Sequence, residues 1–131
     1  MYLGDEISEF EQLIGWIVLN AFYDGDSIYL CTYKGVVKLS PHGDCCATCY
    51  VQHVAGADAL RNSVVTRIEH ITMPTLVDHE YNDVSDLWGH VIYTDKGTCS
   101  IEMRVDHNGY YGGELRIGRC ADPMGKILDD F

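Results

Sequence analysis

The segment from Thr94 to Ile117 constrains the fold of this chain more than any other. It reads T-D-K-G-T-C-S-I-E-M-R-V-D-H-N-G-Y-Y-G-G-E-L-R-I, with apolar and polar residues alternating on both sides of Asn108-Gly109. Alternation with a period of two is typical of half-buried strands, and Asn-Gly is a frequent hairpin turn. The segment therefore predicts a hairpin between two antiparallel strands, Thr98 to Val105 and Tyr110 to Ile117.

The register of this predicted hairpin depends on its glycines. A two-residue loop would set the apolar Met103 opposite the charged Glu114. A shift of one residue repairs the pattern, because each slip by one turns every side chain to the other face. Either Gly112-Gly113 forms a bulge, or a three-residue loop holds Gly109 in a left-handed conformation. The glycines thus have a structural explanation that requires no ligand.

Other stretches predict further strands, because turn residues such as Asp24-Gly25-Asp26 and Lys34-Gly35 separate apolar or alternating runs. These predicted strands are Trp16 to Tyr23, Ser27 to Tyr33, Val36 to Leu39, Thr48 to Val54, Val64 to Thr72 and Trp88 to Thr94. The first three are expected to form an antiparallel meander. We expect a mainly β (α+β) fold, an antiparallel sandwich or barrel of about seven or eight strands with one or two short helices.

The helices and the longest loop follow from local signals. Ser8-Glu9-Phe10-Glu11 fits the S-x-x-E capping box and predicts a brief helix that ends near Gly15. Gly56 to Asn62 predicts a single helical turn. Met73 to Asp86, which contains a proline and several acidic residues, is expected to be the longest irregular stretch.

Length and composition bound the class of protein. The chain has 131 residues, of which 47% are hydrophobic, and we expect one globular domain over residues 1–131. No apolar run approaches the ~20 residues that a membrane helix needs, so no membrane partner is expected. The first residues are acidic, where a secretory signal would be basic and then apolar. We therefore expect a cytoplasmic protein.

The charge balance limits the classes of partner that the protein can bind. There are 20 acidic residues against 9 basic ones, which gives a net charge of −11. A field of that sign repels phosphate backbones, so direct binding to nucleic acid is disfavoured. The acidic surface serves either solubility or the docking of a basic partner, and net charge alone does not separate these two roles.

The cysteine-rich segment from His42 to Cys49 is a candidate metal site. Cys46 and Cys49 have the C-x-x-C spacing that suits two thiolates on one zinc ion. The candidate ligands are His42, Cys45, Cys46 and Cys49. The alternative is that these thiols are free and pack as small apolar groups. A Cys–His catalytic pair is a further alternative, but phosphate loops and nucleophile elbows are absent from the sequence, which favours a non-enzymatic protein.

Two other groups are candidate interaction residues. The acidic side chains of the long loop suit a partner-facing role better than a metal cage, because their spacing does not match a calcium-binding loop. Tyr110 and Tyr111 occupy adjacent strand positions, so one is expected to pack inward while the other is exposed for a ligand or an interface. The predicted interaction residues are Tyr110, Tyr111, Asp78, Glu80, Asp83 and Asp86.

Several motifs occur together in a familiar order. They are D-C-C at Asp44 to Cys46, the run from Tyr50 to Leu60, Tyr93-Thr94-x-Lys96-Gly97, and N-G-Y-Y-G-G from Asn108 to Gly113. In these motifs the chain resembles a family of short uncharacterised proteins, domains of unknown function, encoded by tailed bacteriophages and bacteria. The resemblance covers about Phe10 to Arg119. It implies a phage or prophage setting, hence a host cytoplasm, and it supplies no functional residue.

Three functional hypotheses remain open. The chain is a small acidic accessory protein of phage type, which binds and inhibits a host protein such as a nucleic-acid-handling or defence factor. Alternatively it is a small-ligand binding module that uses the Tyr110–Gly113 hairpin, or a zinc-stabilised structural domain. A homodimer formed through an open sheet edge is compatible with each of these.

Overall fold

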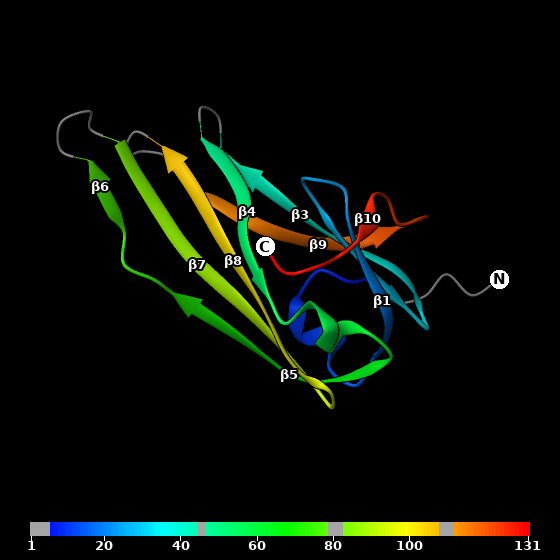
Figure 1. Cartoon of the computed structure of the whole chain (residues 1–131). Coiled ribbons are helices and arrows are strands. Elements are labelled where there is room, and N and C mark those ends of the chain that lie inside the picture. Colours follow the sequence, from blue (N-terminus) through cyan, green and yellow to red (C-terminus); the bar gives the residue numbers. More distant parts are fainter. Residues whose placement is uncertain (1–5, 45–46, 79–82, 108–111) are drawn as a thin grey trace.

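The computed structural model describes residues 6–44, 47–78, 83–107 and 112–131. Nearly all of its regular structure is antiparallel strand (Figure 1). The elements in chain order are the 3-10 helix η1 (Phe10–Leu13), β1 (Ile17–Tyr23), β2 (Ile28–Thr32), β3 (Gly35–Gly43), β4 (Thr48–Ala55), the 3-10 helix η2 (Ala57–Leu60), β5 (Ser63–Thr72), β6 (Leu76–Asp78), β7 (Asp83–Thr94), β8 (Gly97–His107), β9 (Gly113–Cys120) and β10 (Lys126–Ile127).

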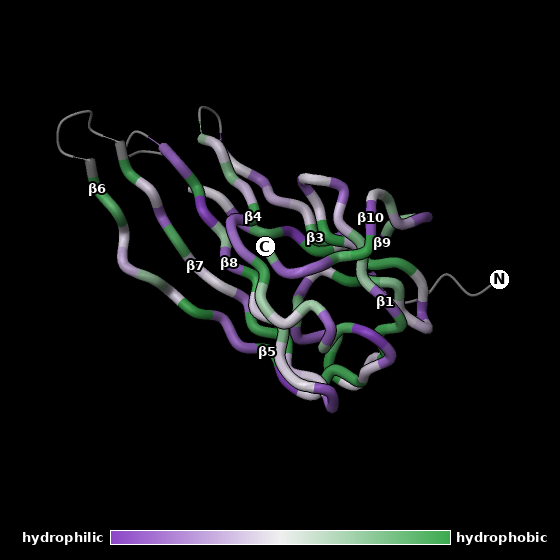
Figure 2. The backbone as a smooth tube through the Cα atoms, viewed as in Figure 1, coloured by the Kyte–Doolittle hydropathy of each residue, from purple (hydrophilic) through white to green (hydrophobic). Residues whose placement is uncertain are grey.

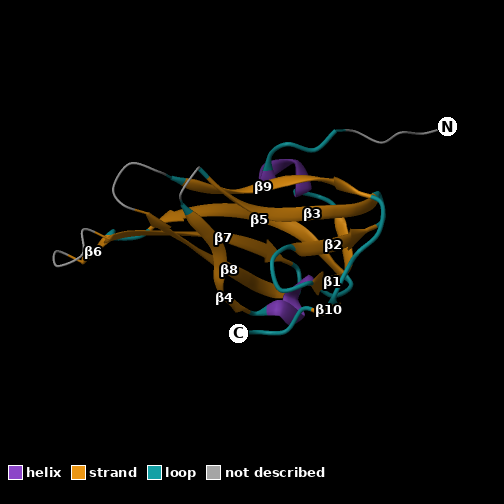
Figure 3. Cartoon of the chain, turned by 90° about the horizontal axis from the view of Figure 1, so that it is seen from above, coloured by secondary structure: helices purple, strands orange, loops and turns teal. Residues whose placement is uncertain are grey.

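The strands form one sheet that folds over on itself. Its order is β4-β8-β7-β5-β1-β2-β3-β9, with β6 paired to β7 and β10 paired to β1. The halves join where Ile17 and Val18 of β1 pair with Val64 and Ser63 of β5, and the two halves then face each other (Figure 3). The expected mainly β antiparallel fold is confirmed. It has ten strands in place of seven or eight, and the sheet is not closed into a barrel.

The core lies between the two halves. On β8 the side chains of Ile101 and Met103 are fully buried, and Val105 is almost so, while the residues between them are polar. The predicted inward face of this strand is therefore confirmed, and the same alternation is visible along the tube of Figure 2. Leu13 of η1 and Leu60 of η2 are fully buried and contribute to the same core. Hydrophobic burial of this kind is the main stabilising contribution to such a fold.

The predicted pairing of the last hairpin is wrong. Strand β8 pairs with β4 on one side and β7 on the other, whereas β9 pairs with β3 from Val36↔Cys120 to Gly43↔Gly113. The alternation of β9 is nevertheless meaningful, because Leu115 is buried against the core. An amphipathic pattern specifies which face of a strand points inward, but it does not specify the neighbouring strand.

Two local predictions also need correction. The stretch from Met73 to Asp86 is not wholly irregular, because β6 pairs with the start of β7 in the register Asp78↔Asp83. The first helix is a single 3-10 turn capped one residue later than predicted. Its capping glutamine is Gln12, whose side-chain oxygen accepts the backbone N–H groups of Ser8 and Glu9 at 2.7 and 2.9 Å.

The C-terminal tail joins the two halves, which the sequence did not predict. Leu128 is buried and donates its backbone N–H to Ala21 of β1, and Phe131 exchanges two backbone hydrogen bonds with Val54 of β4. Gly125 has φ +87° and approaches the Tyr23 carbonyl too closely for a side chain. Among the described residues, no helix is long and apolar enough to cross a membrane.

Candidate functional site

Strand pairing brings three segments of interest to one end of the molecule. Gly43 at the end of β3 lies opposite Gly113 of β9, and Val84 of β7 lies opposite His107 at the end of β8. The cysteine segment, the acidic stretch and the N-G-Y-Y-G-G motif therefore all begin or end here. We call this end of the sheet the strand-end rim; it comprises His42, Asp44, Cys49, Asp78, Asp83, Asp86, Asp106, His107, Gly112, Gly113 and Glu114.

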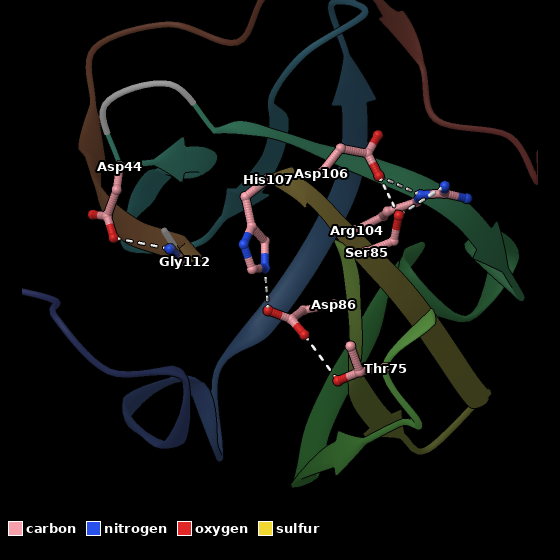
Figure 4. A network of polar contacts seen from close by, with 8 residues as sticks. All are labelled: Asp44, Thr75, Ser85, Asp86, Arg104, Asp106, His107 and Gly112. Carbon is pink, nitrogen blue, oxygen red and sulfur yellow. Dashed lines mark hydrogen bonds and ion pairs between the residues drawn. The ribbon is translucent and has the colours of Figure 1, made fainter. Parts of the chain in front are cut away.

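Asp44 connects the end of β3 to the residue that precedes β9. Its backbone N–H donates to the Gly112 carbonyl at 2.9 Å, and its Oδ2 accepts the Gly112 N–H at 3.0 Å (Figure 4). A cavity of about 240 Å³ lies beside this pair, lined by His42, Asp44, Gly112, Gly113 and Glu114. The motif glycines are thus held against a carboxylate at the edge of a small hollow.

Cys49 explains the need for glycine at this point. A Cβ atom on Gly113 would lie 2.9 Å from the Cys49 Sγ and 3.2 Å from the His42 carbonyl oxygen. The Cys49 thiol itself donates weakly to the Glu114 carbonyl at 3.7 Å. Gly113 therefore allows β4 to approach β3 and β9 closely. The glycine was expected to have a structural role in hairpin register, whereas its role in the structure is this close approach of strands.

The predicted zinc site is only partly visible. Cys45 and Cys46 lie outside the described residues, His42 is exposed on β3, and Cys49 is half-buried. Burial raises the pKa of the Cys49 thiol, which favours the neutral form. No group of three or more metal-binding side chains occurs within the described parts of the chain. Zinc binding at these residues stays a prediction.

On the inner face of the rim, His107 and Thr75 both contact Asp86. The His107 Nε2 lies 2.7 Å from one carboxylate oxygen, and the Thr75 hydroxyl donates to the other at 2.9 Å (Figure 4). The His107 side chain is only 6% exposed. Asp86 was predicted to lie in an irregular partner-facing loop, but it belongs to β7 and holds neighbouring side chains in place.

On the outer face, Asp106 is the centre of a second network. It accepts hydrogen bonds from Ser85 at 2.6 Å, from Arg104 at 2.8 Å and from Tyr50 at 3.2 Å, so the cluster spans β4, β8 and β7. Burial opposes ionisation of Asp106, but the bonds from Ser85 and Arg104 outweigh it and lower its pKa. Arg104 also donates to the Ser85 oxygen at 3.0 Å.

These two networks do not form a catalytic pair. Asp106 and His107 are consecutive on β8 and point to opposite faces, so the Ser85 hydroxyl and the His107 ring are on different sides of the sheet. Ser85 donates to the Asp106 carboxylate and accepts from Arg104, so both of these partners lie on the outer face, away from His107. Within the described residues, the rim is a surface of strand ends fixed by hydrogen bonds.

A further polar cluster lies where η1 packs on the sheet. The His70 Nδ1 and His90 Nδ1 are 2.8 Å apart, and the other His70 nitrogen contacts the Glu11 carboxylate. The ring of Phe10 stacks on His90 at 4.5 Å between centroids and an interplanar angle of 4°. The His90 Nε2 is buried and has no hydrogen-bond partner among the described atoms.

Protonation of this cluster is constrained by burial. Burial and the neighbouring His70 lower the pKa of His90 to about 4, so His90 is neutral at pH 7. The hydrogen bond from His70 lowers the pKa of Glu11. Phe10 covers His90, so this buried histidine supports η1, while the side chains of His70 and Glu11 are about half exposed.

The structure covers the predicted interaction residues unevenly. Glu80, Tyr110 and Tyr111 lie outside the described residues, so their role stays a prediction. Asp78 and Asp83 are opposite each other in the β6–β7 ladder. Sequence reasoning missed Thr75, Tyr50, Ser85, Arg104 and Asp106; the polar positions on β8 were visible, but their cross-strand partners depend on β4 and β7.

Comparison with known proteins places the chain in a family. No curated protein and no solved structure matches it. A family model described as a domain of unknown function, DUF7448, matches residues 11–117. This match spans most of the chain, so the protein belongs to the DUF7448 family.

Proposed function

We propose that this protein is a non-enzymatic, phage-type accessory protein that binds, and thereby inhibits, a basic host protein in the host cytoplasm through the strand-end rim. The observation that carries the proposal is the meeting of the cysteine segment, the acidic stretch and the N-G-Y-Y-G-G motif at one end of the sheet. Loops positioned by a rigid sheet are a common place for binding residues.

Charge supports a basic partner. The chain carries a net charge of −11, and Asp44 and Glu114 are exposed at the rim. A surface of this sign attracts cationic proteins and repels nucleic acid. The phage setting rests on the resemblance of the sequence motifs to proteins of tailed phages and bacteria.

A pull-down from host lysate tests the proposal. Three substitutions of rim residues, Asp78→Asn, Asp83→Asn and Glu114→Gln, remove three negative charges. A control variant removes three negative charges elsewhere, at Asp58, Asp95 and Asp122. We expect the rim variant to lose the salt-sensitive basic proteins that the wild type and the control retain. Equal retention by all three proteins would refute the proposal.

A small-ligand role is a second candidate. The cavity of about 240 Å³ is lined by Gly112 and Gly113, which follow Tyr110 and Tyr111 in the sequence, and by acidic and imidazole groups. A thermal-shift screen with nucleotides and other metabolites tests it. We expect a ligand to raise the melting temperature of the wild type but not of a Tyr110→Ala, Tyr111→Ala variant, and no shift with any compound would argue against this role.

A further inference from the structure

A groove separate from the networks of the strand-end rim lies between the β1–β2 turn and the C-terminal tail. It has a volume of about 480 Å³, and its lining is mostly apolar. Its lining residues are Tyr23, Asp24, Gly25, Gly125, Lys126, Ile127, Asp129, Asp130 and Phe131. Every one of these residues lies in the described part of the chain.

The apolar part of the groove is formed by side chains that the fold leaves exposed. Tyr23 and Phe131 stack with their ring centroids 4.8 Å apart. Phe131 is 41% exposed and Ile127 is 50% exposed, although the neighbouring Leu128 is buried. The tail therefore anchors itself through Leu128 and its backbone while it leaves an aromatic and an aliphatic surface open to solvent.

The polar part of the groove is negatively charged. Three carboxylates, those of Asp24, Asp129 and Asp130, line it together with a single ammonium, that of Lys126. The carboxylates also act on Tyr23: burial raises the pKa of this tyrosine, and Asp26 and Asp24 raise it further.

The three carboxylates differ in how many contacts they make within the protein. Asp24 accepts the Tyr29 hydroxyl at 2.7 Å and two backbone N–H groups, and Asp130 accepts the Ala57 N–H at 2.8 Å. The Asp129 side chain is 83% exposed and has only a 3.2 Å contact with Arg61. Asp129 is thus the carboxylate most accessible to a ligand.

From this combination we infer that the groove binds a lysine or arginine side chain on a basic, partly apolar segment of a partner protein. The aliphatic stem of such a side chain packs on Ile127, its cationic group lies over the Phe131 ring and beside Asp129, and an adjacent apolar side chain of the partner fills the remaining wall. Cations are attracted to aromatic faces, and long basic side chains bury their stems on apolar surface. This inference rests on the proposed function, because it names the chemistry of the same basic partner.

The test uses a defined probe with the full chain. A capped hexapeptide of alternating leucine and arginine is titrated into ¹⁵N-labelled protein, with glutamate in place of arginine in a control peptide. We expect saturable shifts at the amides of Gly25, Gly125 and Ile127 with the arginine peptide only. Shifts confined to other residues, or equal shifts with the glutamate peptide, would overturn the inference.

Matched variants separate the groove from general charge effects. Asp129→Asn and Asp58→Asn each remove a carboxylate that contacts Arg61, but only Asp129 lines the groove. We expect Asp129→Asn to weaken peptide binding roughly twofold to fivefold, as for an exposed ion pair, and Asp58→Asn to leave it unchanged. Phe131→Ala should weaken binding by about fivefold. Equal affinities for all these proteins would contradict the inference.

The outcome is also distinguishable from failure of the proposed function. In one outcome the rim variant loses host partners, whereas Asp129→Asn and Phe131→Ala retain both the partners and the wild-type affinity for the peptide. The rim then binds the partner and the groove does not. If the groove variants alone lose the partners, the basic segment docks at the groove and the rim proposal is wrong.

Discussion

The buried His90 makes this fold sensitive to mild acid. In the unfolded chain the imidazole takes up a proton near pH 6.5, whereas in the folded protein it does so only near pH 4. Between these values the unfolded state binds more protons, so stability decreases as the pH falls from about 6.5 to about 4. Glu11 acts in the same direction, because its lowered pKa means that the stabilising carboxylate is lost on acidification.

The magnitude follows from the difference between the two pKa values. At about 1.36 kcal/mol for each unit of pKa difference, His90 lowers the free energy of unfolding by roughly 3 kcal/mol at acidic pH. About 2 kcal/mol of this decrease in stability occurs between pH 7 and pH 5. The side chain is only 9% exposed, so solvent screening reduces the effect little. This is a large part of the ~5–15 kcal/mol that stabilises a typical domain.

The assay is urea unfolding at several pH values, followed by tryptophan fluorescence. The perturbation is His90→Phe, which keeps a ring that can stack on Phe10 but cannot titrate. We expect the wild type to lose about 2 kcal/mol more than the variant between pH 7 and pH 5. His53→Gln, which removes an exposed histidine of β4, is the control and should follow the wild type. Parallel loss of stability in the wild type and His90→Phe would refute the reasoning.

Three other predictions concern the rim and the tail. Gly113→Ala should lower stability by about 1–3 kcal/mol, because the new methyl group would overlap Cys49, whereas Gly118→Ala on the same strand has open space and should change stability little; equal effects in chemical denaturation would contradict this. Leu128→Ala should cost about 2–5 kcal/mol, since this side chain is buried where the tail joins the sheet halves, and an unchanged unfolding midpoint would show that the tail is not anchored there. Elemental analysis of protein purified without chelator should find one zinc per chain if the four predicted ligands bind it, and fully stable zinc-free protein would exclude that hypothesis.

The parts of the fold that sequence predicts well are local. The meander of β1, β2 and β3 was predicted because Asp24-Gly25-Asp26 and Lys34-Gly35 specify short turns between neighbouring strands. The inward face of β8 was predicted because its alternation is unbroken. Both signals are contained within a few residues, so they do not depend on the rest of the chain.

The parts that sequence predicts poorly depend on distant partners. The Asn108-Gly109 signal suggested that β9 returns beside β8, but both edges of β8 are taken by β4 and β7. The contact of His70 with His90 likewise arises only from the β5–β7 register. The candidate site shows the same division: the sequence identified the motif residues, whereas their meeting at one rim is a consequence of topology.

The central claim is that the strand-end rim is the surface that binds a partner. The most direct measurement is hydrogen–deuterium exchange of the free protein and of its affinity-purified complex with the captured host protein. We predict slower exchange in the complex for peptides that contain Asp44, Asp78, Asp83 and Gly112. If exchange at these positions is the same with and without the partner, the rim does not bind it and the proposed function is wrong.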